Sequence, residues 1–498
     1  MDIQRHRLPA SVKLLYSVGA IGEALFLRGY DYFIFFYFVA VLGMPPIWAG
    51  TALLVSTILD AISDPLVGSI SDTWKSPRGR RHPLMYLGTI PFALSWYLLL
   101  MPPADLDGAG LFGWFLVFSI LLRQGFTLFQ VPHLALGTEI TTDYEERTSV
   151  VTWRIASSFV GGYIVIAGFT ALCFPESAAY PENGLLDPSG YPKLATAGGV
   201  ILLLSCAVSA LGTQSQAARL PQVSPNVERP SLRRILEEAR LAWESPSFRA
   251  LFIGQLLFVC SFGINEVFGQ FVRIYFWGLT SGQLAILTIP GSIGFLAATA
   301  LSPLVHRRFD KKPAAIVSAV LPSLLAAVLV IGRLAGLVPD NDLIVMPLLF
   351  ATALLTGICG GVAFVSAGSM MGDVAHEIVT RTKRGATGVL VAGTSFAQKC
   401  SSGIAHFVAA AVLQLLDLEQ SADSGTLAPE VVRSLGYASL VACVFGIAGA
   451  LAYSGYRIDR ESYAALTRVD PPEPAPLDAA STPAPEPTAG EPRPVSLV

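Results

Sequence analysis

Charged residues are scarce in this chain. Only 14% of its 498 residues are Asp, Glu, Lys or Arg, against roughly a quarter in an ordinary globular protein. The formal net charge is −3, so the basic excess typical of a nucleic-acid-binding protein is missing. The six cysteines stand singly, without a CxxC pair or a histidine spacing that indicates a metal site. These shortages exclude a nucleic-acid partner and a dissolved metabolic enzyme. We therefore expect a protein that is not an enzyme and needs no cofactor.

Apolar residues fill most of the chain instead. Their share is 53%, enough for about twelve helices of ~20 residues across a lipid bilayer. The apolar runs are continuous and do not alternate, which excludes an outer-membrane barrel. Backbone groups cannot stay unpaired in lipid, so each run must be helical. We predict an all-α membrane protein with twelve spans, near 14–42, 47–71, 83–102, 111–138, 148–173, 194–214, 248–277, 282–305, 313–335, 343–372, 385–416 and 431–456.

The basic residues are distributed unevenly between the two sides of the membrane. Of the 33 Lys and Arg residues, 25 fall on the side that carries both termini, and three, Lys193, Arg333 and Arg433, fall on the other. Cytoplasmic loops carry an excess of Lys and Arg. We therefore predict a multi-pass protein of the cell (inner) membrane with both termini in the cytoplasm. The first apolar run is too long for a signal-peptide core, so we expect it to be retained.

The spacing of the spans divides the chain into two halves. The longest interior loop lies between spans six and seven, and the basic loops 72–83 and 306–313 both follow the second span of a half, as a parallel repeat requires. The last 28 residues contain nine prolines, which is typical of a disordered tail. The predicted units are an N-terminus at 1–13, a six-helix bundle at 14–214, a linker at 215–247, a second six-helix bundle at 248–456 and a cytoplasmic tail at 457–498.

Two carboxylates stand in the middle of span two. Asp60 and Asp64 share one helix face because they are four residues apart. Asp60 lies 12 residues from the charged end at Asp72, or about 18 Å along the helix, near the bilayer midplane. The two carboxylates repel unless a cation or a proton lies between them, and Thr127 offers a hydroxyl at similar depth. We predict a site for Na⁺ or H⁺ formed by these three residues. The alternative is a structural pair bonded to a basic residue or to backbone.

Other ionisable residues within spans need a partner or a water-filled cavity. Lys399, in span eleven, requires a carboxylate, and we expect it to meet the span-two pair and so couple the halves. A neutral or locally paired lysine is the alternative. Arg154 can present its guanidinium to hydroxyls or anionic groups of a solute, or else extend to the interface. Glu23 has no local partner and is expected in the cavity, and Glu266 belongs to a polar stripe in span seven.

Charged residues at the cytoplasmic helix ends are predicted to open and close the cytoplasmic side of the protein. They can form ion pairs between neighbouring helix ends in one conformation and release them in another, although a solvated charged loop is an equally simple interpretation. The residues concerned are Asp72, Arg78, Arg80, Arg81, Arg147 and Asp373.

Over residues 11–460 the chain resembles the glycoside–pentoside–hexuronide:cation symporter family of the major facilitator superfamily, typified by the melibiose carrier. The resemblance is carried by the stretches 16–22, 60–68, 131–133 and 143–148 and by Lys399. The stretch 60–68 is the most specific of these.

The resemblance implies the major facilitator fold, with two six-helix bundles around a central cavity. It also implies that Asp60 and Asp64 bind the coupling cation together with Thr127, and that Arg154 and Lys399 act in sugar binding and coupling.

The resemblance does not extend to the residues that bind the sugar. The family binds a galactoside through two aspartates and a tryptophan, and this chain has Ala24, Gln130 and Leu134 at those positions. Glu23 and Gln130 could instead bond another polar solute. We therefore expect a monomeric symporter, driven by Na⁺ or H⁺, for a small solute of the glycoside, pentoside or hexuronide class. A Na⁺-coupled lysophospholipid carrier, a proton-driven exporter and a non-transporting membrane sensor remain alternatives.

Overall fold

The computed structural model describes residues 8–141, 143–219, 237, 240–382, 387–416, 427–459 and 462–463. Most of the predicted linker at 215–247 and of the predicted tail at 457–498 lies outside the described residues.

The first half is a group of long helices packed side by side. It consists of α1 (Ala10–Gly29), continued by the π-helical segments η1 (Tyr30–Ile34) and η2 (Tyr37–Val41), α2 (Pro46–Thr73), α3 (His82–Leu99), α4 (Gly108–Glu139), α5 (Tyr144–Phe159), continued by η3 (Val160–Ile164) and α6 (Val165–Cys173), and α7 (Gly190–Thr213), with the short η4 (Gly184–Leu186) and η5 (Gln214–Arg219).

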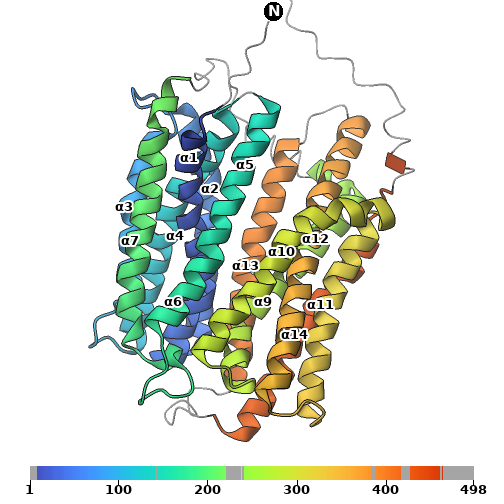
Figure 1. Ribbon diagram of the computed structural model, residues 1–498. Coiled ribbons are helices and arrows are strands. Elements are labelled where there is room, and N and C mark those ends of the chain that lie inside the picture. The colour runs from blue at the N-terminus through green and yellow to red at the C-terminus, as the bar shows by residue number, and fades with distance from the viewer. Residues whose placement is uncertain are drawn as a thin grey trace, which may run out of the picture.

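The second half repeats this arrangement beside the first (Figure 1). It consists of α9 (Pro246–Phe271), continued by η6 (Val272–Phe276), α10 (Ser281–Phe309), α11 (Lys311–Leu334), α12 (Asp342–Thr382), α13 (Thr387–Leu415) and α14 (Pro429–Ser454).

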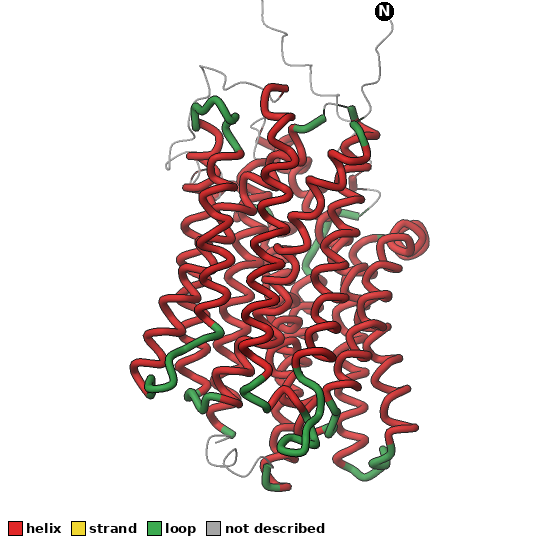
Figure 2. The backbone as a smooth tube through the Cα atoms, turned by 60° about the vertical axis from the view of Figure 1, so that its left-hand side comes forward, coloured by secondary structure: helices red, strands yellow, loops and turns green. Residues whose placement is uncertain are grey.

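The predicted all-α membrane fold is confirmed. Each predicted span coincides with a helix, and the described chain carries no strand (Figure 2). Ten of the helices among the described residues are long and apolar enough to cross a membrane. The largest difference in bounds is at α12, which continues to Thr382, beyond the predicted end at 372. Its last turns are amphipathic rather than apolar, so hydropathy alone placed the end too early.

The first helix of each half widens at a corresponding position. α1 passes into η1 and α9 passes into η6, both of them π-helical. π-Helical segments within α-helices occur frequently at functional sites. Phe36, between η1 and η2, packs against Phe271 at the end of α9, with ring centroids 5.1 Å apart. The two widened segments therefore bring the halves into contact.

Contacts between the halves gather at one end of the molecule. We call the end with the start of α1 and the last residue of α14 the terminal end, and the opposite end the distal end. At the distal end, the Asn183 side chain donates to the Leu279 carbonyl at 2.7 Å, and the Ser281 hydroxyl accepts from the Gly184 N–H at 2.8 Å. Nearer mid-depth, His406 of α13 pairs with Asp31 of η1 at 2.9 Å. The structure is thus a conformer whose halves are joined at the distal end.

One distal contact depends on pH. The Gly282 N–H donates to the Glu176 carboxylate at 3.1 Å, and this bond holds the pKa of Glu176 below its usual 4.5. A lowered pKa means that the bond is complete above pH 4.5 and is lost as the pH falls through the lowered value. Lowering the pH from 4.5 through this lowered pKa should therefore raise the fraction of molecules whose distal end is open.

Spin labels at the exposed positions Ala178 and Leu337 can measure this opening by their distance distribution. In Glu176→Gln the pH dependence over this range should disappear. An identical acid response in both proteins would assign the opening to other groups.

Candidate cation and solute sites

A cluster of charged and hydroxyl side chains joins α2, α4 and α13 near mid-depth. The Thr127 hydroxyl lies 2.5 Å from the Asp60 carboxylate and 3.1 Å from that of Asp64. The Lys399 ammonium lies 2.7 Å from Asp60 and 2.5 Å from Asp64. Asp60 is 2% exposed, and a buried carboxylate persists only when it is paired. The three side chains predicted to share a cation therefore meet at one point, together with the predicted lysine.

The lysine lies between the two aspartates that were predicted to bind a cation. Its ammonium bridges the two aspartates and neutralises their repulsion. A Na⁺ ion between the same oxygens would do likewise, because hard cations prefer carboxylate and hydroxyl ligands. Pro65, the residue after Asp64, has no N–H, so the Ala61 carbonyl one turn earlier lacks its intrahelical donor. The two carboxylates of the cluster have four acceptor oxygens, whereas the ammonium of Lys399 has three N–H donors. The described residues contain no group of three or more His, Cys, Asp or Glu that could hold a metal ion.

A second polar cluster is buried within the first half. The Arg154 guanidinium donates to the Glu23 carboxylate at 2.8 Å, and the other oxygen of Glu23 contacts the His133 ring at 2.5 Å. The expectation that Glu23 faces a cavity was wrong, because Glu23 is 2% exposed. Arg154 does not extend to the interface but turns towards α1, and its side chain is 26% exposed. Any role of Glu23 in solute binding must therefore act through Arg154.

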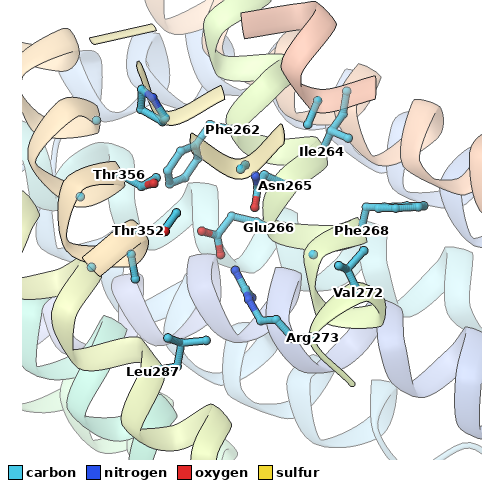
Figure 3. Close-up of a pocket in the computed structure, with 18 of the residues that line it drawn as sticks. Phe262, Ile264, Asn265, Glu266, Phe268, Val272, Arg273, Leu287, Thr352 and Thr356 are labelled. Atoms are coloured by element: carbon cyan, nitrogen blue, oxygen red, sulfur yellow. The ribbon is translucent and has the colours of Figure 1, made fainter. Parts of the chain in front are cut away.

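The described cavity lies between the second half and the η3 region of the first. Its volume is about 290 Å³. Arg28 and Tyr163 line it from the first half, and Glu266 and Arg273 from α9 and η6. The side chains of Glu266 and Arg273 point towards one another along this wall (Figure 3). Most of the remaining wall is apolar, so the cavity combines a few charged side chains with a largely apolar lining.

The predicted solute residues do not all reach this cavity. Glu266 lines it, whereas Arg154, Lys399 and Gln130 are not part of its described lining. Gln130 is half-buried on α4. Arg28 also lines the cavity. It donates to the Tyr163 hydroxyl at 3.0 Å and lies 3.9 Å from Glu266, which links the two halves beside the cavity.

The predicted gating residues form ion pairs inside each half rather than between the halves. In the first half, Arg81 contacts Asp72 at 2.6 Å and Glu139 at 2.5 Å, and Arg80 contacts Glu139 at 2.9 Å. In the second half, Lys311 contacts Asp373 at 2.6 Å.

Two of the predicted gating residues have no such role in this conformer. The side chains of Arg78 and Arg147 are exposed at the terminal end. The networks of the two halves nevertheless correspond, since each connects the start of one helix to the end of the next long helix.

Removing Arg81 should destabilise the first half. Its side chain is 5% exposed and also donates to the Ser71 hydroxyl at 3.0 Å, so Arg81→Ala leaves Glu139 without its main partner. Breaking a buried charge pair from one side costs about 3 kcal/mol or more. The thermal unfolding midpoint of the purified protein in detergent should fall markedly. Arg78→Ala, which removes an exposed side chain of the same loop, serves as the control and should leave the midpoint unchanged.

Several residues of the site were missed by reasoning from sequence. His133 was noted only as part of a motif, and Glu139 was not considered as the partner of Arg81. Asp143, in the following loop of the same end, does not contact Arg81 but accepts from the Glu146 N–H as the N-cap of α5. The signal that could have found Glu139 is its place at the last turn of α4, beside the start of α3.

Two bundles joined at one end, with a charged cluster at mid-depth between them, define the class of secondary transporters. The family model described as MFS/sugar transport protein matches residues 15–460. The chain belongs to this family.

Curated relatives include several symporters. The chain is 26% identical over 295 residues to the inner membrane symporter YicJ of Escherichia coli, covering 55% of this chain and 60% of that protein. It is 28% identical over 233 residues to an uncharacterized symporter of Synechocystis, covering 46% and 41%. It is 32% identical over 158 residues to sodium-dependent lysophosphatidylcholine symporter 1 of Gallus gallus, covering 32% and 30%. The matched region thus spans about a third to three fifths of these relatives.

Solved structures share the fold. A bacterial homolog of the human lysosomal transporter Spinster, in an inward-facing and unoccupied conformation, superposes with a TM-score of 0.62 at 14% identity, over 92% of this chain and 97% of that chain. The nucleoside transporter NupG superposes with a TM-score of 0.59 at 14% identity, over 90% and 99%. These likenesses establish the major facilitator fold and carry no information about the solute.

Proposed function

We propose that the chain is a cation-coupled symporter of a small organic solute that works by alternating access. The observation that carries this proposal is the bridge from Lys399 of one half to Asp60 and Asp64 of the other. A cation bound by the aspartates and Thr127 would compete with the lysine for the same oxygens. Ion binding would therefore act directly on a contact between the halves, which is what coupling requires.

The competition defines two states with different affinities for the ion. With the lysine inserted, its positive charge offsets the repulsion between the two aspartates and the halves are linked at mid-depth. With Na⁺ or H⁺ on the aspartates, the ammonium is released and the halves are free to rearrange. A ligand moves such an equilibrium only through its differential affinity for the two states. The solute would add to this difference by binding in the conformer that holds the ion.

For the solute we propose a sugar or glycoside, of the glycoside, pentoside or hexuronide class. Arg154 and Lys399 supply donors near mid-depth, while Gln130 and Glu266 supply further polar groups on facing helices. Several partly exposed side chains that can pair with hydroxyl groups suit a polyhydroxy compound. The matching family, which includes sugar carriers by its description, supports the same class.

The alternative solute is a lysophospholipid. The cavity favours it, because an apolar interior bordered by the guanidiniums of Arg28 and Arg273 suits an acyl chain with a phosphate headgroup. The similarity to lysophosphatidylcholine symporters points the same way. A third possible function for the same residues is export of a solute driven by protons.

We also propose that the protein is a monomer in the inner membrane, with the terminal end in the cytoplasm. The excess of Lys and Arg at that end supports this orientation. The conformer described here would then be open to the cytoplasm, since its halves are joined at the distal end. The two six-helix bundles at 14–214 and 248–456, the linker at 215–247 and the terminal segments at 1–13 and 457–498 would be its units.

Transport by purified protein in sealed vesicles tests the proposal. Labelled glycosides, uronides and lysophospholipids are offered with an inward Na⁺ gradient, with an inward H⁺ gradient, or with neither. Accumulation of a sugar compound above equilibrium with one gradient would support the first proposal, and accumulation of a lysophospholipid the alternative. Downhill equilibration with no effect of either gradient would overturn cation coupling.

A further inference from the structure

His133 lies between two hydrogen-bond acceptors inside the first half. Its Nε2 atom is 2.9 Å from the Tyr16 carbonyl oxygen, and its Nδ1 atom is 2.5 Å from the Glu23 carboxylate. A backbone carbonyl can only accept a hydrogen bond, so Nε2 must carry a hydrogen. The hydroxyl of Ser209 donates to the same carbonyl at 3.0 Å, which fixes its position.

The contact with Glu23 requires a second proton. A neutral imidazole has one N–H, and the Tyr16 carbonyl already uses it. The short contact at Nδ1 is a hydrogen bond only if a further proton sits on the imidazole or on the carboxyl group. Turning the ring over would replace both nitrogens by C–H groups and remove both bonds. The pair therefore holds one proton more than a neutral histidine and an ionised glutamate.

The surroundings suit a proton and exclude a larger ion. His133 is fully buried and Glu23 is 2% exposed, so no space for a hydrated cation adjoins them. The titratable groups that face the pair are Tyr16 on α1, Arg154 on α5 and Cys206 on α7. With the extra proton, the cluster of Glu23, His133 and Arg154 carries one positive charge, and without it the cluster is neutral.

We propose that Glu23 and His133 form a proton-binding site of the first half, separate from the aspartate cluster on α2. When the proton is bound, Glu23 is neutralised by His133 and Arg154 is left with an uncompensated charge. The guanidinium, which is partly exposed, is then free to attract an anionic group. When the proton leaves, Glu23 retains Arg154 as its counter-ion. The site thus ties the charge presented by Arg154 to proton occupancy, whether or not the aspartate cluster binds Na⁺.

Nitrogen NMR of protein labelled with ¹⁵N-histidine tests the site without any transported solute. The spectrum is recorded at a pH of about 8, where a free imidazole with a pKa of about 6.5 is largely neutral. His406 also lies between a carbonyl and a carboxylate, that of Asp31, so Asp31→Asn is used to remove its contribution. In Asp31→Asn we expect one histidine with both ring nitrogens protonated, or else a protonated carboxyl stretch in the infrared spectrum. Either signal should disappear when Glu23→Gln is added.

His82 provides an internal control, since its Nε2 atom contacts only the Thr213 hydroxyl at 3.1 Å and it should be neutral at this pH. The Asp31→Asn protein decides the question even if Glu23→Gln fails to fold. If it shows neither a doubly protonated histidine nor a protonated carboxyl group at about pH 8, the extra proton is absent and the proposal is overturned. A signal that persists in a folded Glu23→Gln variant would also overturn it, because the proton would then belong to another group.

Discussion

Asp60→Asn should abolish gradient-driven accumulation of the solute while leaving downhill exchange measurable. Asp60 is the more buried of the two α2 aspartates and contacts both Thr127 and Lys399. Asparagine keeps the size of the side chain but removes its charge, so a cation would find one carboxylate instead of two. The ammonium of Lys399 would still have Asp64 as a partner at 2.5 Å, and the halves would remain linked. We therefore expect a loss of coupling rather than a loss of folding.

The measurement is uptake into vesicles at matched amounts of inserted protein, with and without the ion gradient. In Asp60→Asn the two traces should coincide, so that a several-fold accumulation falls to the equilibrium level. Asp105→Asn, which changes an exposed carboxylate in the loop between α3 and α4, should behave as wild type. Undiminished accumulation by Asp60→Asn would show that the coupling ion binds elsewhere.

The helices and the aspartate cluster could be predicted because their signals are local or nearly unavoidable. Lipid forces long apolar segments to be helical, so hydropathy located every span, although it placed the end of α12 too early. The spacing of Asp60 and Asp64 placed both carboxylates on one face. A buried ammonium needs a carboxylate, and this argument correctly paired Lys399 with residues more than 300 positions away.

The second cluster could not be predicted in the same way. Glu23, His133 and Arg154 come from three different helices, and each alone had a simpler interpretation. Their meeting depends on the rotation of α1, α4 and α5 about their own axes, which hydropathy does not fix because all three helices are apolar on several sides. The same uncertainty hid the pairing of Asp31 with His406.

Lys399→Ala should raise the affinity of the aspartate cluster for the coupling ion while lowering accumulation. The ammonium lies within 2.7 Å of both carboxylates, so an incoming cation must displace it. Without this competitor, an ion would relieve the repulsion of the aspartates directly, and its apparent affinity should rise about tenfold or more, which corresponds to ~1.4 kcal/mol. The ion would no longer break a contact between the halves when it binds. The free energy of ion binding would therefore increase occupancy of the site without favouring rearrangement of the halves.

Binding of radioactive Na⁺ to purified protein, and its displacement by protons, measures the first effect, and uptake per inserted protein measures the second. Lys193→Ala, which removes an exposed lysine near the start of α7, is the matched control and should change neither. A variant with wild-type ion affinity and wild-type accumulation would show that Lys399 is only a structural counter-ion. Weaker ion binding would be equally damaging, because it would mean that the lysine helps to hold the ion rather than competing with it. A rise in ion affinity together with a fall in accumulation is therefore expected only if Lys399 occupies the ion's place between the two halves.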